Sequence, residues 1–218
     1  MCGRVVSLCV CLCLALQHCN NFWLCLCQAK SAYDLNVGDY AVSLTPGACQ
    51  RYHVADARHT LFKIPQPSSS GTEAARNDQS FFSEAAALLC THGTAYLALT
   101  ERTGVQQGQT VLVTAAAGGV GLAAIAIAKL LGANVVAASS SEPKLQIAEQ
   151  YGADHGVIYN NENDGDDASD SLSLSERCKR ATNNEGVDVV LEMCGGSVFK
   201  ESLKALKWGG KVCIIGFA

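Results

Sequence analysis

The chain has 218 residues, 49% of them hydrophobic, and a formal net charge of -4. Its length suits one ordinary domain and part of a second, and its composition supplies enough apolar surface for a sizeable core. A weakly acidic chain has no field that would attract DNA, RNA or an anionic membrane, so small molecules are the expected partners.

The first 33 residues differ from the rest, because seven of the twelve cysteines lie before residue 28. An apolar stretch at 5–16 follows Arg4, and a second apolar patch ends at Cys27, but neither can span a bilayer. Three interpretations stay open: a secretory signal peptide cleaved near residues 27–29, an organelle-targeting presequence, and an atypical start without specific function.

The other five cysteines lack the paired spacings of a zinc site or of a disulfide-rich module, so we expect no metal site. We interpret them as buried, reduced thiols. They are Cys49, Cys90, Cys178, Cys194 and Cys213.

From residue 110 onwards the pattern alternates between strand and helix. Strands are predicted at 110–116, 134–138, 157–159, 187–192 and 211–216, and helices near 122–131, 142–151, 174–181 and 198–207. This alternation predicts a parallel sheet covered on both faces, which is a Rossmann-type, doubly wound α/β fold. The acidic run at 160–170 is predicted to be a solvated loop rather than a metal site.

A glycine-rich segment joins the first of these strands to the first helix. Its residues are Ala117, Gly118, Gly119, Val120 and Gly121. Aligned on the pattern G-x-G-x-x-G, the first glycine is replaced by Ala116. Glycines let the backbone approach a diphosphate closely, and the helix amino terminus stabilises its charge. We therefore predict that this segment binds a dinucleotide; the alternative is a tight turn with a structural role only.

The end of the second strand favours NADPH over NADH. NAD-dependent enzymes usually place a carboxylate there to bind the ribose 2′-hydroxyl, but this chain has Ser139, Ser140 and Ser141. No charge repels a 2′-phosphate, and Lys144 can attract it. Ser141, which precedes Glu142 and a proline, also fits the amino-terminal cap of a helix, and both roles can hold at once.

Several segments together resemble a known family. They are T-V-L-V-T-A-A-A-G-G-V-G-L-A-A, V-V-A-A-S-S-S-E-P-K, Y-G-A-D-H-G-V-I-Y-N, G-V-D-V-V-L-E-M-C-G-G and G-G-K-V-C-I-I-G-F-A. In order and spacing they resemble the zinc-free NADPH:quinone oxidoreductases and quinone oxidoreductase-like proteins of the medium-chain dehydrogenase/reductase superfamily, over about residues 34–218. Ala116 is similar to these proteins rather than to the zinc alcohol dehydrogenases, which usually have glycine there.

The resemblance implies roles for individual residues. It implies that Ser140, Lys144 and Tyr159 hold the 2′-phosphate and that Thr94 lies beside the nicotinamide. Backbone at 194–196 and 216–218 would lie along the far half of the cofactor, which adds Cys194, Gly195, Gly216 and Phe217 to the predicted site. His92 could act as a proton donor, but a lone histidine on an apolar helical stretch is more often a packed core residue.

The activity implied by the resemblance is hydride transfer from NADPH to a quinone or an enone, without a metal. We identify no catalytic residue. The alternative is a truncated NADP-binding module without turnover, and a zinc alcohol dehydrogenase is disfavoured. We expect a cytoplasmic protein, with a mitochondrial location as the alternative, and the full-length family form allows for a homodimer.

The expected domain organisation follows from the same resemblance. Residues 1–33 form the atypical cysteine-rich segment, and residues 34–66 look like the last strands of a GroES-like β-barrel substrate domain. A polar linker at 67–80 precedes the Rossmann domain at 81–218, whose helical part starts near Phe81. We expect the barrel to lack its earlier strands and the sheet to lack the sixth strand found in the family.

Overall fold

The computed structural model describes residues 22–26, 40–44, 61–64, 79–159 and 172–216. The chain divides into two compact units, residues 1–90 and 91–218. Among the residues described, every helix is too short or too polar to cross a bilayer.

The first unit contains a three-stranded antiparallel sheet in the order β1-β2-β3. Its strands are β1 (Phe22–Leu26), β2 (Tyr40–Leu44) and β3 (Leu61–Lys63). β2 and β3 fall in the segments that we expected to be barrel strands, whereas β1 was not predicted. The proposed relation to a GroES-like barrel stays a prediction.

A long helix, α2 (Gln79–Tyr96), begins two residues before the predicted start and continues into the π-helical turn η1 (Leu97–Arg102). Its amino-terminal part belongs to the first unit and its last turns to the second. In the second unit, Ala95, Ala98 and Leu99 are buried against the sheet described next.

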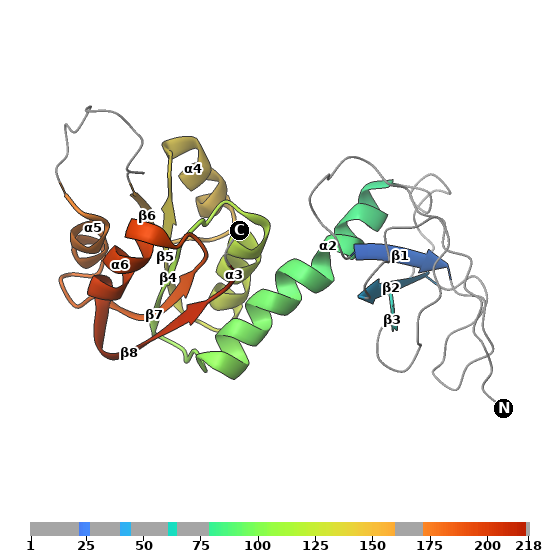
Figure 1. Ribbon diagram of the computed structural model, residues 1–218, viewed down its shortest axis with the longest axis horizontal. Coiled ribbons are helices and arrows are strands. Elements are labelled where there is room, and N and C mark those ends of the chain that lie inside the picture. The colour runs from blue at the N-terminus through green and yellow to red at the C-terminus, as the bar shows by residue number, and fades with distance from the viewer. Residues whose placement is uncertain (1–21, 27–39, 45–60, 65–78, 160–171, 217–218) are drawn as a thin grey trace. The chain divides into compact units, whose positions relative to one another are not determined.

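The second unit is built on a five-stranded parallel sheet in the order β6-β5-β4-β7-β8 (Figure 1). Its strands are β4 (Thr110–Val113), β5 (Asn134–Ser139), β6 (His155–Ile158), β7 (Val187–Glu192) and β8 (Leu206–Ile214). The helices between them are α3 (Gly119–Leu130), α4 (Glu142–Gln150), α5 (Leu174–Ala181) and α6 (Gly196–Ala205). The predicted Rossmann-type fold is confirmed.

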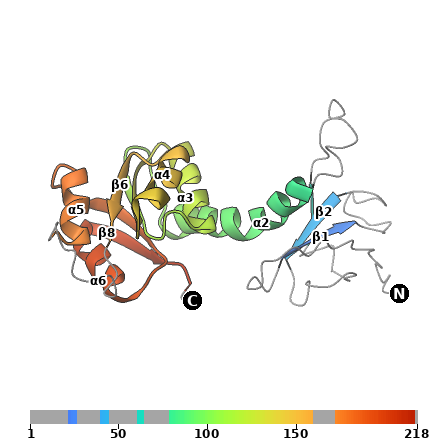
Figure 2. The same ribbon diagram turned by 90° about the horizontal axis from the view of Figure 1, so that it is seen from above.

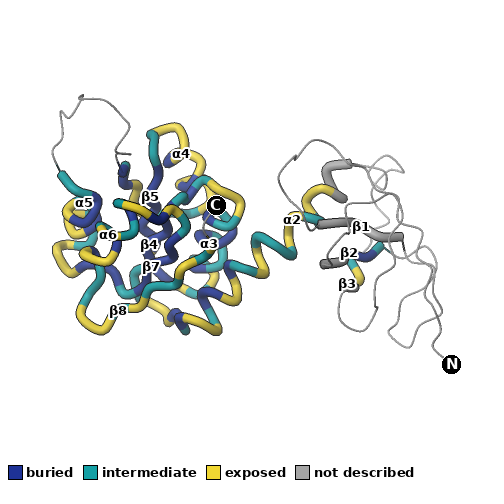
Figure 3. The backbone as a smooth tube through the Cα atoms, in the orientation of Figure 1, coloured by how far each residue is buried: buried dark blue, intermediate teal, exposed yellow. Residues whose placement is uncertain are grey.

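Alternation along β4 explains why the sheet is covered on both faces. Val111 and Val113 belong to one hydrophobic cluster and Leu112, between them, to another, because successive side chains of a strand point to opposite faces. η1, α3 and α4 contribute to the first cluster, and α5 and α6 to the second (Figure 2). The central strands are therefore buried from both sides (Figure 3).

Most element bounds agree with the prediction, and the differences have local causes. β4 stops at Val113 instead of residue 116, because a turn follows in which Ala115 has a φ of +46°. β8 begins at Leu206, well before the predicted residue 211, and replaces the end of the predicted helix 198–207. Its pairing with β7 is interrupted by an irregularity between Val187 and Val189.

Candidate functional site

The turn between β4 and α3 lies at the carboxyl end of the central strand, and it holds the glycine-rich segment. The N–H of Gly118 donates to the carbonyl of Ala115 over 2.9 Å, and the N–H of Ala116 donates to Ala138 of β5 over 3.0 Å. Gly118 is the N-cap of α3, and no side chain caps the helix. The first N–H groups of α3 thus have no partner within the helix, which suits an anion.

Close packing explains the last glycine of the motif. A Cβ atom on Gly121 would lie 2.6 Å from the carbonyl oxygen of Ala115 and 2.7 Å from that of Ala116. At Gly118 the nearest atom, again the oxygen of Ala115, would be 3.2 Å away. The helix therefore starts directly against the turn, while Gly118 and Gly119 are exposed to solvent. The backbone at this start of the helix is therefore accessible from solvent.

Two of the three side chains predicted to hold the 2′-phosphate, Ser140 and Lys144, lie together at the end of β5. The Nζ of Lys144 donates to the Oγ of Ser140 over 2.9 Å, and this pair is exposed. Ser139 is buried, with 2% of its surface exposed, so its hydroxyl is less accessible to a ligand. Ser141 occupies the N-cap of α4 as predicted, but its hydroxyl makes no capping hydrogen bond.

The backbone of Tyr159 lies beside that pair, because its N–H donates to the carbonyl of Ser139 over 3.0 Å, but its hydroxyl makes other contacts. Its hydroxyl accepts a hydrogen bond from the Sγ of Cys194 over 3.4 Å and has a backbone hydrogen bond with Ala115. Burial, followed by the Cys194 contact, raises the pKa of the Tyr159 hydroxyl well above its usual value. Within the part of the chain that is described, no hydrogen bond joins Tyr159 to Ser140 or Lys144. The structure thus places Tyr159 at the glycine turn.

The carboxyl end of α2 also approaches the glycine turn. A Cβ on Gly119 would lie 3.0 Å from the Cγ2 of Thr91, and Thr94 follows one turn later, half-buried. His92 is exposed, with its Nδ1 3.0 Å from the Oγ1 of Thr91. The interpretation of His92 as a packed core residue is therefore wrong, because this side of α2 faces solvent.

The loop between β7 and α6 also lies at the end of the sheet formed by the carboxyl termini of the strands. Cys194 is exposed and Gly195 is buried, with a φ of +74° that favours glycine. The N–H of Ile215 donates to the carbonyl of Glu192 over 2.8 Å, which brings Gly216 to the same edge. Phe217 lies outside the described residues.

Glu192 also belongs to this site, and it was not among the predicted residues. Its side chain is fully buried at the end of β7, and it accepts hydrogen bonds from the N–H groups of Cys194 and Gly195. The strand V-D-V-V-L-E also carries Asp188, so its pattern does not distinguish the buried carboxylate of Glu192.

Comparisons with known proteins agree on one family. Residues 119–218 match the family model described as Zinc-binding dehydrogenase. Quinone oxidoreductase-like protein 2 of Rattus norvegicus is 39% identical over 73% of this chain and 39% of its own length, and that of Mus musculus is 35% identical over 83% and 46%. The chain is thus similar to the quinone oxidoreductase-like proteins of the medium-chain dehydrogenase/reductase superfamily. It spans less than half the length of these relatives.

Solved structures of this superfamily share the fold. A mycobacterial protein complexed with NADPH superposes with a TM-score of 0.75 at 24% identity, covering 99% of this chain and 66% of its own. A mycobacterial quinone oxidoreductase has a TM-score of 0.68 at 27% identity, with 91% and 56% covered, and the CurK enoyl reductase 0.70 at 29%, with 89% and 52% covered.

The name of the matched family raises the question of a metal. Among the residues described, no group of three or more His, Cys, Asp or Glu side chains is placed to hold a metal ion. Among the described residues, Cys178, Cys194 and Cys213 form no disulfide, and Cys90 is half-buried. Cys178 is buried as predicted, whereas the prediction of burial is wrong for Cys194, which is exposed; Cys49 lies outside the described residues.

Proposed function

We propose that this chain is the cofactor-binding part of an NADPH-dependent oxidoreductase that reduces a quinone or an enone without zinc. The observation that carries the proposal is the Lys144–Ser140 pair, which ends the strand next to the glycine turn. A phosphate-binding turn with a cationic pair beside it suits a dinucleotide with an additional phosphate on its ribose.

The residues of the turn fit a diphosphate. The uncapped amino terminus of α3 offers N–H groups to its oxygens, and the backbone at Gly118 and Gly119 is exposed to solvent. No acidic side chain stands at residues 139–141, while Lys144 supplies a positive charge about one helical turn further along. A 2′-phosphate therefore gains an attractive partner at the end of β5.

When bound, NADPH supplies the hydride, and the protein contributes position and orientation. The glycine turn would hold the diphosphate, and Ser140 and Lys144 would hold the ribose phosphate. Thr94 and the backbone at Cys194, Gly195 and Gly216 would contact the other half of the cofactor. Relatives named quinone oxidoreductase-like protein 2, enoyl reductase and prostaglandin reductase support an electron-poor acceptor.

A second candidate function is NADP binding without turnover. The described residues offer groups for the cofactor, but none of them is assigned to the acceptor, and catalysis needs both reactants held in register. Oxidation of NADPH in the presence of a simple quinone distinguishes the two functions, because binding without oxidation supports the second. The cytoplasmic location and the homodimer of the full-length form stay predictions.

Titration of the chain with NADPH and NADH tests the cofactor assignment. We expect Lys144→Ala to weaken NADPH binding by about tenfold, since a charge-assisted contact to phosphate is lost, and to leave NADH binding unchanged. Lys204→Ala is the matched control, because Lys204 is an exposed lysine of α6 that pairs with Glu201. Absence of NADPH binding, or the same preference for NADPH over NADH before and after Lys144→Ala, would overturn the proposal.

A further inference from the structure

Glu192 is a buried carboxylate whose hydrogen bonds join two loops. Its side chain is inaccessible to solvent, and its two oxygens accept hydrogen bonds of 3.1 and 3.0 Å from the N–H of Gly195 and one of 3.0 Å from that of Cys194. In the described part of the chain, no Lys, Arg or His forms an ion pair with it. A carboxylate is costly to bury unless N–H donors surround it. The buried Glu192 side chain therefore depends on the loop conformation that points these two N–H groups at it.

Thr114 connects the same carboxylate to the glycine turn. Its hydroxyl lies 3.3 Å from the Oε1 of Glu192 and accepts a hydrogen bond of 2.8 Å from the N–H of Met193. Thr114 directly follows β4 and precedes Ala115, the residue with the left-handed backbone. One buried cluster therefore fixes the β7–α6 loop relative to the turn that would hold the diphosphate.

The order of the strands determines which half of a dinucleotide this loop would meet. β5, which leads to Ser140 and Lys144, pairs with one side of β4, and β7 pairs with the other side. If the diphosphate binds at the end of β4 and the 2′-phosphate beyond β5, the rest of the cofactor has to extend over the end of β7. That end carries Cys194 and Gly195, whose N–H groups donate to Glu192.

We infer that Glu192 is a positioning residue, which holds the β7–α6 loop in the conformation that binds the nicotinamide half of the cofactor. The inference rests on the proposed function, and it assigns to Glu192 an effect on one half of the ligand only. The adenosine half, bound on the other side of β4, does not depend on this loop.

Two ligands distinguish the two halves of the cofactor site. NADPH occupies both halves, and adenosine 2′,5′-bisphosphate carries only the adenosine half. We expect Glu192→Gln to weaken NADPH binding by about tenfold, because the amide nitrogen would face the N–H of Gly195 and displace the loop. The affinity for the bisphosphate, measured by competition and by direct titration, should change by less than about twofold.

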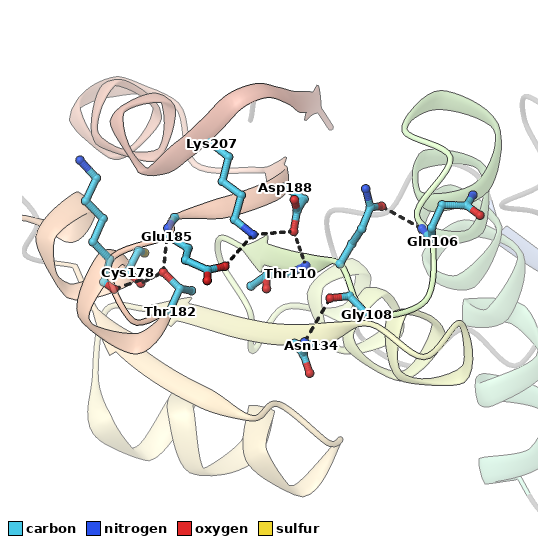
Figure 4. Close-up of polar contacts among 12 residues, drawn as sticks. Gln106, Gly108, Thr110, Asn134, Cys178, Thr182, Glu185, Asp188 and Lys207 are labelled. Carbon is cyan, nitrogen blue, oxygen red and sulfur yellow. Dashed lines mark hydrogen bonds and ion pairs between the residues drawn. The ribbon is translucent and has the colours of Figure 1, made fainter.

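The same strand provides a matched control. The carboxylate of Asp188 also joins β7 to β4, by accepting a 2.7 Å hydrogen bond from the N–H of Thr110, and it contacts Lys207 over 3.3 Å (Figure 4). It lies four residues before Glu192, at the opposite end of the strand, about 13 Å away at 3.3 Å per residue. We expect Asp188→Asn to lower the melting temperature but to change neither affinity.

A second pair of variants tests the inference if Glu192→Gln does not fold. Thr114→Val removes the hydroxyl that links Glu192 to the glycine turn, and Thr114→Ser keeps it. We expect the valine variant to lose NADPH affinity selectively and the serine variant to restore it.

Each result supports or overturns the inference. If Glu192→Gln weakens the binding of both ligands equally, its role is purely structural, and if the NADPH affinity is unchanged, it has no role. Either result overturns the inference while the proposed function stands. A wild-type chain that binds NADPH but not the bisphosphate overturns it too, because the halves are then not held separately. A wild-type chain that does not bind NADPH overturns the proposed function itself.

Discussion

Substitution of Gly121 by alanine tests how tightly α3 packs against the glycine turn. The new Cβ would lie 2.6, 2.7 and 2.9 Å from three backbone atoms of Ala115 and Ala116, where ordinary contacts are 3.4 to 4 Å. Backbone atoms cannot rotate away as the end of a side chain can, so the turn or the helix has to shift. Overpacking of this kind costs about 3 kcal/mol at the upper end of its usual range.

A gain in helix propensity opposes this cost. Gly121 lies within α3 and has no left-handed backbone, so alanine contributes about 1 kcal/mol to helix formation there. The net destabilisation is therefore about 2 kcal/mol, which lowers the melting temperature by about 4–8 °C for a chain of this size. Thermal unfolding followed by far-UV circular dichroism measures it.

Gly119→Ala is the control from the same helical turn. Its Cβ would meet only the Cγ2 of Thr91, 3.0 Å away, and this methyl group can move by rotation of its side chain. The strain and the gain in helix propensity then nearly cancel, and we expect a change in stability within about 0.5 kcal/mol. If Gly121→Ala melts at the temperature of the wild type or of Gly119→Ala, the packing argument is wrong.

Three further predictions concern the second unit. Burial raises the pKa of Asp154, but the hydrogen bonds from Lys129 and from the N–H of Val135, together with the nearby positive charge, outweigh it and lower the pKa below 3.8. The pair therefore stabilises the fold above pH 3.8 and loses its effect as the pH falls further; because both side chains are partly exposed, Asp154→Asn should cost only about 0.5 kcal/mol at pH 7. Ser173 forms a capping box with Glu176 at the start of α5, and Ser173→Ala should cost about 1 kcal/mol in urea unfolding. Burial raises the pKa of the Cys178 thiol to about 12, so iodoacetamide at pH 8 should not label it in the folded chain.

Each of these three predictions has a result that would contradict it. An Asp154→Asn effect that persists unchanged at pH 2 would exclude the charge as its cause. A Ser173→Thr variant keeps a capping hydroxyl, so equal losses from the alanine and threonine variants would contradict the capping argument. Labelling of Cys178 as fast as that of the exposed Cys194, measured by peptide mass spectrometry, would show that the core opens.

Local patterns in the sequence were sufficient for the arrangement of elements in the second unit. β7 and α5 have the predicted bounds, because an apolar run ending in a charge and a serine before a polar helix are signals that depend on a few neighbours. The glycine turn was placed by the same kind of signal, since a strand, a glycine cluster and a helix follow one another directly.

Contacts between distant residues could not be predicted in this way. Thr114 and Glu192 are 78 residues apart, and they meet only because β4 and β7 are neighbours in the sheet. An acidic residue is usually exposed, so nothing in its local sequence marks Glu192 as buried. The position of Tyr159 at the glycine turn and the exposure of Cys194 and His92 depend on the same packing.

The sequence by itself therefore determined the alternation of strands and helices, the turn that suits a diphosphate and the pair that suits a 2′-phosphate, because each depends on residues within about one element of each other. Only the tertiary structure decided which loops meet at the carboxyl edge of the sheet. That edge is assembled by the order of the strands, which joins residues far apart in the chain and leaves no local pattern to detect.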